Sequence, residues 1–91
     1  MNVKQTNVFR RRVKKLQKVE KLALDDAINE VIVNPSIGEM KVGDLAGIQV
    51  FKYKVKAQLF LLAYEYLDDE VLLILIEHGV HENFYRDLKR K

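Results

Sequence analysis

The sequence predicts an α+β domain in which a helical hairpin packs on an antiparallel sheet and a C-terminal helix follows the sheet. Two observations predict this class. Apolar residues recur at helical spacing in the first third of the chain, and from Ile48 the period changes to two, as in a β-strand. The chain has 91 residues, so we expect one domain over residues 1–91. The expected order of elements is β-α-α-β-β-β-α.

Two helices are expected after a short strand at residues 3–5. Thr6 or Asn7 can cap the first helix, because their side-chain oxygens accept hydrogen bonds from free backbone N–H groups. Apolar residues then recur at i, i+4 and i+7, namely Phe9, Val13 and Leu16. The second helix is expected over about 19–33, with an apolar face of Leu22 or Leu24, Ala27, Ile28, Val31 and Ile32. The Asn-Pro pair at 34–35 ends it, since proline excludes the preceding residue from the helical region.

Three strands are expected after a loop at 36–47, in which we predict little regular structure. They lie at about 48–56, 59–67 and 71–77, and short turns join them into an antiparallel meander. The second and third strands are apolar on both faces, so both faces should be covered there. The helical hairpin can cover one face. A last helix over about 82–90, with Phe84 and Leu88 inward, can lie near the other.

Positive charge is gathered in two segments, although the net charge is only +3. Residues 1–18 contain no acid and the following bases: Lys4, Arg10, Arg11, Arg12, Lys14, Lys15 and Lys18. Residues 86–91 add Arg86, Lys89, Arg90 and Lys91 against Asp87. Such clustering indicates a polyanion or an acidic protein as partner. A solvated helix face explains the same pattern about equally well.

Several classes of chemistry are excluded or disfavoured. The chain has no cysteine, hence no disulfide, thiolate nucleophile or cysteine-metal site. It has no phosphate-binding glycine loop, no GxSxG and no HExxH. Two histidines three residues apart, without a third ligand, rarely hold a metal, so we expect neither metal nor other cofactor. No apolar run reaches the ~18 residues of a membrane helix, and the basic N-terminus lacks a signal peptide's apolar stretch. We therefore expect a cytoplasmic protein without membrane association.

The first candidate site is a row of lysines, with Lys52, Lys54 and Lys56 expected on one face of a strand. Alternate strand positions lie ~7 Å apart, close to the spacing of successive phosphates in an extended nucleic acid. Lysine binds phosphate as a point charge. A buried unpaired ammonium is very costly, so we predict an open, positively charged concavity here. A solvated edge strand, whose lysines discourage aggregation, is the structural alternative.

The second candidate site is the segment HGVHENFY at 78–85, which holds both histidines of the chain. It is expected at the end of the last strand, where Gly79 permits a turn. His81 and Tyr85 are four residues apart at a helix start and so share a face. Histidine can exchange a proton near neutral pH, and tyrosine can stack on a base or bind a phosphate. The alternatives are a helix-start role for His81 and a core role for Tyr85.

Nearly the whole chain resembles the RelE/ParE toxin superfamily of bacterial toxin–antitoxin systems. The resemblance lies in the basic first helix and in the segments NPSIGEMKVGDLAGI, FKYKVKAQLFLLAYEY and IEHGVHENFYRDLKR. The last segment looks like the RelE-type mRNA endonucleases rather than the gyrase-directed ParE branch. The resemblance implies a toxin that enters the ribosomal A site and cuts mRNA there. The 2′-hydroxyl attacks the adjacent phosphate without a metal, and the enzyme stabilises charge and moves two protons.

The resemblance also assigns roles to residues. Lys52 and Lys54 match the strand lysines that bind phosphate and assist proton transfer. Tyr85 matches an aromatic residue that stacks on the substrate base. His81 stands where members carry arginine or histidine, which implies a general acid for the leaving 5′-oxygen or a stabiliser of charge. An acidic or DNA-binding antitoxin from an adjacent gene is the implied partner. It or RNA would bind the basic first helix through Arg10, Arg11, Arg12, Lys14 and Lys15.

The chain departs from the family pattern at Leu61, where many members carry an arginine. One phosphate-binding cation is therefore missing, and Lys56 or Arg86 is the expected substitute. Two other functions stay open on the same fold. One is a ParE-like inhibitor of DNA gyrase, which needs no proton-transfer residues. The other is an RNA-binding module without catalysis, which the missing arginine leaves open.

Overall fold

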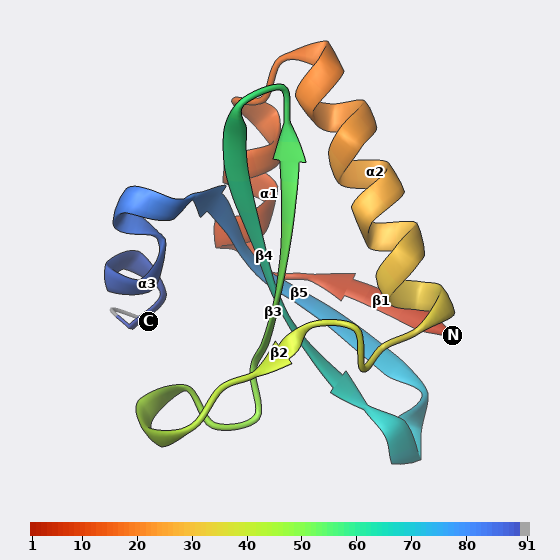
Figure 1. The fold of residues 1–91 in the computed structure, drawn as a ribbon. Coiled ribbons are helices and arrows are strands. Elements are labelled where there is room, and N and C mark those ends of the chain that lie inside the picture. Colours follow the sequence, from red (N-terminus) through yellow and green to blue (C-terminus); the bar gives the residue numbers. More distant parts are fainter. Residues whose placement is uncertain (90–91) are drawn as a thin grey trace.

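A computed structural model describes residues 1–89, and of residues 81–83 the backbone alone (Figure 1). The strands form one five-stranded sheet in the order β1-β5-β4-β3-β2. The strands are β1 Asn2–Gln5, β2 Glu39–Met40, β3 Gln49–Val55, β4 Gln58–Leu67 and β5 Leu72–Val80. The helices are α1 Asn7–Lys14, α2 Lys18–Val33 and α3 His81–Lys89, and short 3-10 turns lie at Gly43–Leu45 and Asp68–Glu70. The α+β class and the antiparallel meander β3-β4-β5 are confirmed.

The helical hairpin begins at a threonine cap, as predicted. Thr6 Oγ1 accepts a hydrogen bond from the Phe9 amide at 3.1 Å and donates one to the Ile76 carbonyl at 2.7 Å. The same hydroxyl therefore caps α1 and ties it to β5. At the start of α2, the Gln17 amide donates to the Glu20 carboxylate at 2.8 Å. The helix ends at Val33, directly before the Asn-Pro pair.

The prediction for Lys56 was wrong in one respect. β3 ends at Val55 and β4 begins at Gln58, so Lys56 and Ala57 form the turn between them. Lys56 has a φ of 57°, in the left-handed region that a hairpin turn requires. It does not continue the strand face of Lys52 and Lys54. The turn was predicted one residue later, at Ala57-Gln58.

Three further features differ from what the sequence predicted. The ladder between β4 and β5 continues to Phe60 and Val80, so His78 and Gly79 lie within the strand rather than in a turn. The loop after α2 contains β2, which pairs with Val50 and Gln49 of β3. The sheet is also mixed, because β1 pairs in parallel with β5.

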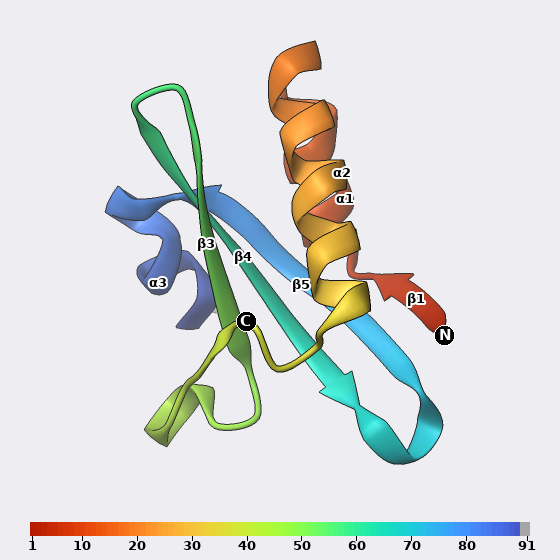
Figure 2. The same cartoon turned by 45° about the vertical axis from the view of Figure 1, so that its right-hand side comes forward.

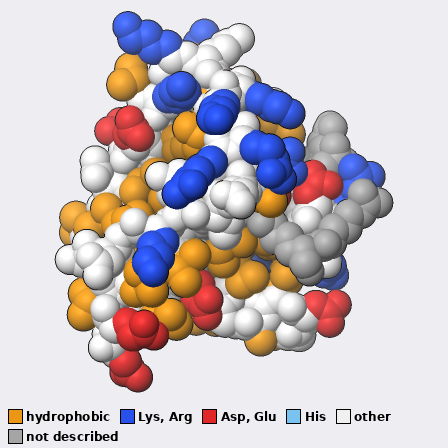
Figure 3. Space-filling view, turned by 180° about the vertical axis from the view of Figure 1, so that it is seen from behind, with side chains coloured by type: hydrophobic (Ala, Val, Ile, Leu, Met, Phe, Trp, Pro, Cys, Tyr) orange, Lys and Arg blue, Asp and Glu red, His pale blue; other side chains and the backbone are white. Residues whose placement is uncertain are grey.

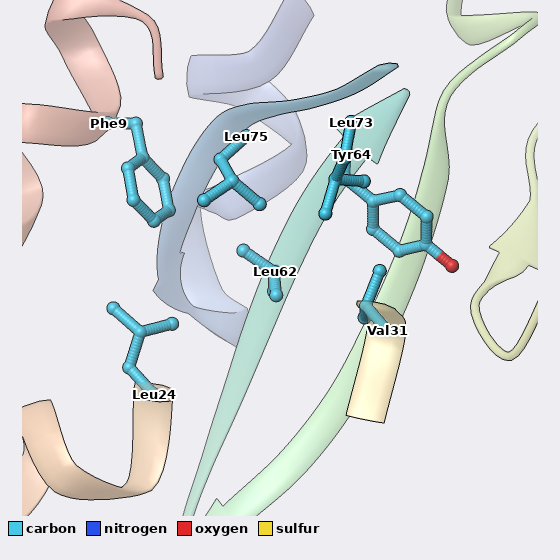
Figure 4. Close-up of a cluster of buried hydrophobic side chains, with 7 residues drawn as sticks. All are labelled: Phe9, Leu24, Val31, Leu62, Tyr64, Leu73 and Leu75. Atoms are coloured by element: carbon cyan, nitrogen blue, oxygen red, sulfur yellow. The ribbon is translucent and has the colours of Figure 1, made fainter. Parts of the chain in front are cut away.

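Each face of the sheet has its own core. The hairpin α1-α2 covers a cluster drawn in Figure 4, formed by Phe9, Leu24, Val31, Leu62, Tyr64, Leu73 and Leu75. α3 covers a second cluster on the opposite face, formed by Leu45, Val50, Leu61, Ala63, Phe84 and Leu88. Leu24, not Leu22, supplies the inner face of α2, as Leu22 is 57% exposed. In Figures 1 and 2 the tip of the β3–β4 hairpin extends beyond α3.

A hydrogen-bonded junction holds the segment between α2 and β2. The Tyr64 hydroxyl donates to the Pro35 carbonyl at 2.7 Å and accepts from the Gly38 amide at 2.9 Å. Gln49 Nε2 donates to the carbonyls of Pro35 and Gly38. A Cβ on Gly38 would lie 2.7 Å from the Tyr64 oxygen, so only glycine fits. The junction fixes where β2 meets β3.

Candidate active site

Lys52 and Lys54 share the α3 face of β3, and both are exposed. The intervening residues point to the opposite face, where Phe51 and Tyr53 pack against the α1-α2 core. Val50, two positions before Lys52, is buried in the α3-side cluster. The alternation predicted from sequence is confirmed for these two lysines.

The strand register brings these lysines toward the start of α3. Lys52 is opposite Leu61, which is opposite Gly79, and Lys54 is opposite Leu59. Neighbouring strands lie ~4.8 Å apart, so ~10 Å separates the backbones of Lys52 and Gly79. α3 begins two residues after Gly79, at His81. The predicted role of His81 falls on a side chain outside the described residues, so only its place in the backbone enters this geometry.

α3 is held on the sheet by two apolar side chains, as predicted. Phe84 and Leu88 are 2% and 3% exposed, and both pack in the α3-side cluster. Tyr85 lies edge-on to Phe84, with ring centroids 5.2 Å apart, and packs at the margin of the same cluster. Tyr85 is half-buried. This exposure is intermediate between a core residue and an exposed residue that stacks on a base, the two alternatives that the sequence left open. Arg86 is exposed, and its Nε lies 3.7 Å from the Asp87 carboxylate.

Leu61 occupies a packed position. It is fully buried beneath α3 together with Phe84 and Leu88, so no cation stands at this point of the middle strand. Lys56 lies in the turn rather than beside Leu61. A different lysine, which the sequence gave no reason to select, lies on this face. Lys41 follows β2, and its Nζ is 5.1 Å from the centroid of the Tyr85 ring.

The basic residues of α1 divide into two groups. Arg10, Arg11, Lys14 and Lys15 are exposed. Figure 3 shows Lys and Arg side chains gathered on the face behind that of Figure 1, where α1 lies. Arg12 instead binds Glu77, which is 2% exposed, through Nε at 2.9 Å and Nη2 at 3.3 Å. This hydrogen bonding raises the pKa of Arg12 and commits its guanidinium to a carboxylate.

His78, the second histidine of the segment, belongs to the core. Its ring is 1% exposed and stacks on Phe60, with centroids 5.3 Å apart and planes 5° from parallel. A hydrogen bond joins its Nε2 to the Tyr53 hydroxyl, and its Nδ1 has no partner among the described residues. Burial lowers the pKa of His78 to about 4. The ring is therefore neutral at pH 7 and faces away from the lysines.

No three His, Cys, Asp or Glu side chains within the described residues are placed to share a metal ion. No helix of the described part is both long and apolar enough to cross a membrane.

Comparison with known proteins identifies the family. A model for the ParE-like toxin of type II bacterial toxin–antitoxin systems matches residues 3–89. The chain belongs to this family of ParE-like toxins. The resemblance to the RelE/ParE superfamily predicted from the sequence is thereby confirmed. No curated protein matches this ParE-like toxin.

Solved structures support the same fold. A chain of the intact E. coli RelBE toxin–antitoxin complex superposes on this ParE-like toxin with a TM-score of 0.72 and 21% identity, covering 89% of this chain and 96% of that one. The isolated E. coli RelE toxin gives 0.69 and 21%, covering 98% and 96%. The YoeB/ParE toxin from Agrobacterium tumefaciens gives 0.71 and 18%, covering 89% and 99%. At such identities the likeness establishes the fold alone.

Proposed function

We propose that this ParE-like toxin is a ribosome-dependent endoribonuclease that cuts mRNA in the A site and so inhibits translation. The observation that carries the proposal is the pair Lys52 and Lys54, exposed on one face of β3. Lys52 lies opposite Leu61 of β4, which lies opposite Gly79 of β5, two residues before α3 begins. α3 begins at His81, and its Tyr85 packs at the margin of the α3-side cluster. We propose that a phosphate binds between Lys52 and Lys54 of β3 and the start of α3, whose first residue is His81.

The reaction proposed is an internal phosphoryl transfer. The 2′-oxygen attacks the adjacent phosphorus, the bond to the 5′-oxygen breaks, and the products are a 2′,3′-cyclic phosphate and a 5′-hydroxyl. One proton leaves the 2′-hydroxyl and one reaches the 5′-oxygen. The two lysines stabilise the phosphorane and assist the first proton transfer. His81 donates the second proton, and Tyr85 stacks on a base to hold the RNA in line.

The charges of two lysines are large enough to stabilise the transition state of the cleavage reaction. A unit charge 4 Å from another contributes about 4 kcal/mol at an effective dielectric constant of 20. Loss of one such stabilising group in an enzyme typically lowers kcat by about 10²–10³-fold. The two lysines can therefore accelerate the reaction strongly even though Leu61 stands where many family members have an arginine.

Other cations are proposed to bind RNA without taking part in the chemistry. Arg86 on α3 and the exposed bases of α1 would contact phosphates, which position nucleic acid without reading its sequence. We leave Arg12 out of this set because it is engaged with Glu77. An acidic segment of a cognate antitoxin is proposed to cover the same basic residues. Because ribosomes are the proposed site of action, we propose that the toxin acts in the cytoplasm.

The test is primer extension on purified ribosomes programmed with a defined mRNA. The wild-type toxin should cut within the A-site codon, and Lys54→Ala should cut at least a hundredfold more slowly. Lys21→Ala removes an exposed lysine from α2, a helix on the other face of the sheet, and is the matched control. Absence of cleavage, together with DNA breaks by purified gyrase, would establish the gyrase inhibitor instead. Salt-dependent RNA binding without any product would indicate the non-catalytic module.

A further inference from the structure

Lys41 lies on the same face of the sheet as Lys52 and Lys54. β2 pairs antiparallel with β3, with Glu39 opposite Val50, and residues directly opposite point to the same side. Val50 is buried in the α3-side cluster, so Glu39 faces α3. Lys41 is two residues further along, and its amide donates to the Ile48 carbonyl at 2.9 Å, which extends the pairing by one step. Its side chain therefore emerges on the α3 face as well.

The Lys41 ammonium is held between two side chains. Its Nζ lies over the ring of Tyr85, 5.1 Å from the ring centroid. It also pairs with Glu39 Oε1 at 3.1 Å. The side chain of Lys41 is 19% exposed and that of Glu39 is 64% exposed. The lysine is thus anchored, whereas its carboxylate partner stands in solvent and can be displaced.

We propose that Lys41 is the third cation of the RNA-binding face and binds the phosphate of the nucleotide that contacts Tyr85. The inference rests on the proposed nuclease function. Lys41 lies opposite Ile48, four residues from Lys52, which is ~13 Å along the strand direction. That span is about two phosphate spacings of an extended chain. An RNA strand following the β3 edge would therefore meet Lys54, Lys52 and Lys41 in order.

Lys41 would replace the positive charge that is missing at Leu61, but from a different position than the two substitutes expected from sequence. Lys56 and Arg86 were considered because they are near Leu61 in the chain or in the final helix. Lys41 instead supplies positive charge beside the ring of Tyr85, in the middle of α3. Glu39 neutralises it in the free toxin, and an RNA phosphate takes the place of that carboxylate on binding.

Matched variants at the ion pair give the test. The mRNA carries a 2′-deoxynucleotide at the scissile position, so binding to programmed ribosomes is measured without cleavage. Single-turnover cleavage is measured in parallel with unmodified mRNA. Lys41→Gln should weaken binding about tenfold and reduce the salt dependence by about one phosphate contact. Lys41→Arg should restore binding, and Glu39→Gln should tighten it, because the competing carboxylate is gone.

The outcomes separate this inference from the proposed function. If the wild-type toxin cuts mRNA and Lys41→Gln binds and cuts equally well, Lys41 is not an RNA ligand and only this inference fails. If Glu39→Gln weakens binding as much as Lys41→Gln does, the pair merely holds the loop, and the inference again fails. If the wild-type toxin cuts no mRNA, both proposals fail together. Thermal unfolding of each variant shows that the comparison is between folded proteins.

Discussion

Arg12 on α1 donates two hydrogen bonds to the carboxylate of Glu77 on β5, at 2.9 Å and 3.3 Å. Glu77 is 2% exposed, and its Oε1 also accepts a hydrogen bond from the His78 amide at 3.0 Å, so protein contacts have replaced nearly all of its hydration. A second carboxylate, that of Asp87 on α3, lies 3.6 Å from Arg12 Nη2. One guanidinium thus links α1, the sheet and the C-terminal helix. Its function is structural, although its neighbours in α1 are free to bind a partner.

We predict that Arg12→Ala lowers the free energy of unfolding by about 3 kcal/mol. This is the lower end of the range for breaking a buried ion pair, because the Arg12 side chain is 38% exposed. Urea unfolding followed by circular dichroism measures it. Arg11→Ala, an exposed neighbour, should change stability by no more than about 0.5 kcal/mol. Adding Glu77→Leu to Arg12→Ala should recover part of the loss. A double variant less stable than Arg12→Ala alone would contradict the account.

We predict that the buried His78 makes the protein less stable at mildly acidic pH. Its pKa is lowered by burial from 6.5 to about 4, so between these values the unfolded chain binds a proton that the folded chain does not. Stability therefore falls as the pH drops through this window, by up to about 1.4 kcal/mol per pH unit. The groups near the ring that also carry charge or titrate are Glu77, Glu20 and Tyr53.

The measurement is urea unfolding at pH 7 and pH 5, compared between wild type and His78→Phe. Phenylalanine keeps the stacking on Phe60 and cannot be protonated. The variant should lose most of the extra pH dependence that wild type has in this range. His81→Ala is the control, since it removes the other histidine of the chain and should leave the dependence in place. Equal pH dependence in wild type and His78→Phe would rule out His78 as its source.

The sequence pattern predicted those features of the fold that are determined by residues close together in the chain. The period of two placed Lys52 and Lys54 on one face, and helical spacing placed Phe84 and Leu88 in the core. The strand through His78 and Gly79 was not predicted, because a glycine between histidines is typical of a turn. What extends the strand is pairing with Leu61 and Leu62, far away in sequence.

Lys41 could not be found in the same way. Its face is set by β2, a strand of two residues, and by the register of β2 against Val50. Neither leaves a periodic signal, since a strand this short shows no alternation. The contact with Tyr85 depends in turn on how α3 packs. The site residues predicted from sequence are those on regular elements, and the one missed lies at a connection.

We predict that removing the hydroxyl oxygen of Tyr64 destabilises the fold. Its hydroxyl donates to Pro35 and accepts from Gly38, and it lies 3.3 Å from Gln49 Nε2. Tyr64→Phe should lower the free energy of unfolding by about 1–3 kcal/mol, because buried partners lose a hydrogen bond. Tyr66→Phe, the same change two residues along the same strand, should cost less. Chemical denaturation of both variants measures the difference. Similar losses in the two would contradict a special role for this hydroxyl.

The sequence predicted Lys54 and Lys56 on one strand face, but Lys56 lies in the turn between β3 and β4. Lys54 lies on the face that we propose binds the scissile phosphate, whereas Lys56 lies in the turn with a φ of 57°. Lys54→Ala should lower single-turnover cleavage by about 10²-fold or more. Lys56→Ala should lower it less than about threefold, the size of one peripheral phosphate contact.

Lys56→Gly adds an independent readout. Glycine accepts a positive φ without strain, so this variant should be as stable as wild type or more so, by up to about 1 kcal/mol. It also removes the charge, so cleavage should match that of Lys56→Ala. Primer extension on programmed ribosomes and urea unfolding provide the two measurements. If Lys56→Ala and Lys54→Ala reduce cleavage equally, the phosphate lies at the hairpin tip rather than over the face of Lys52 and Lys54, and the proposed site must move there.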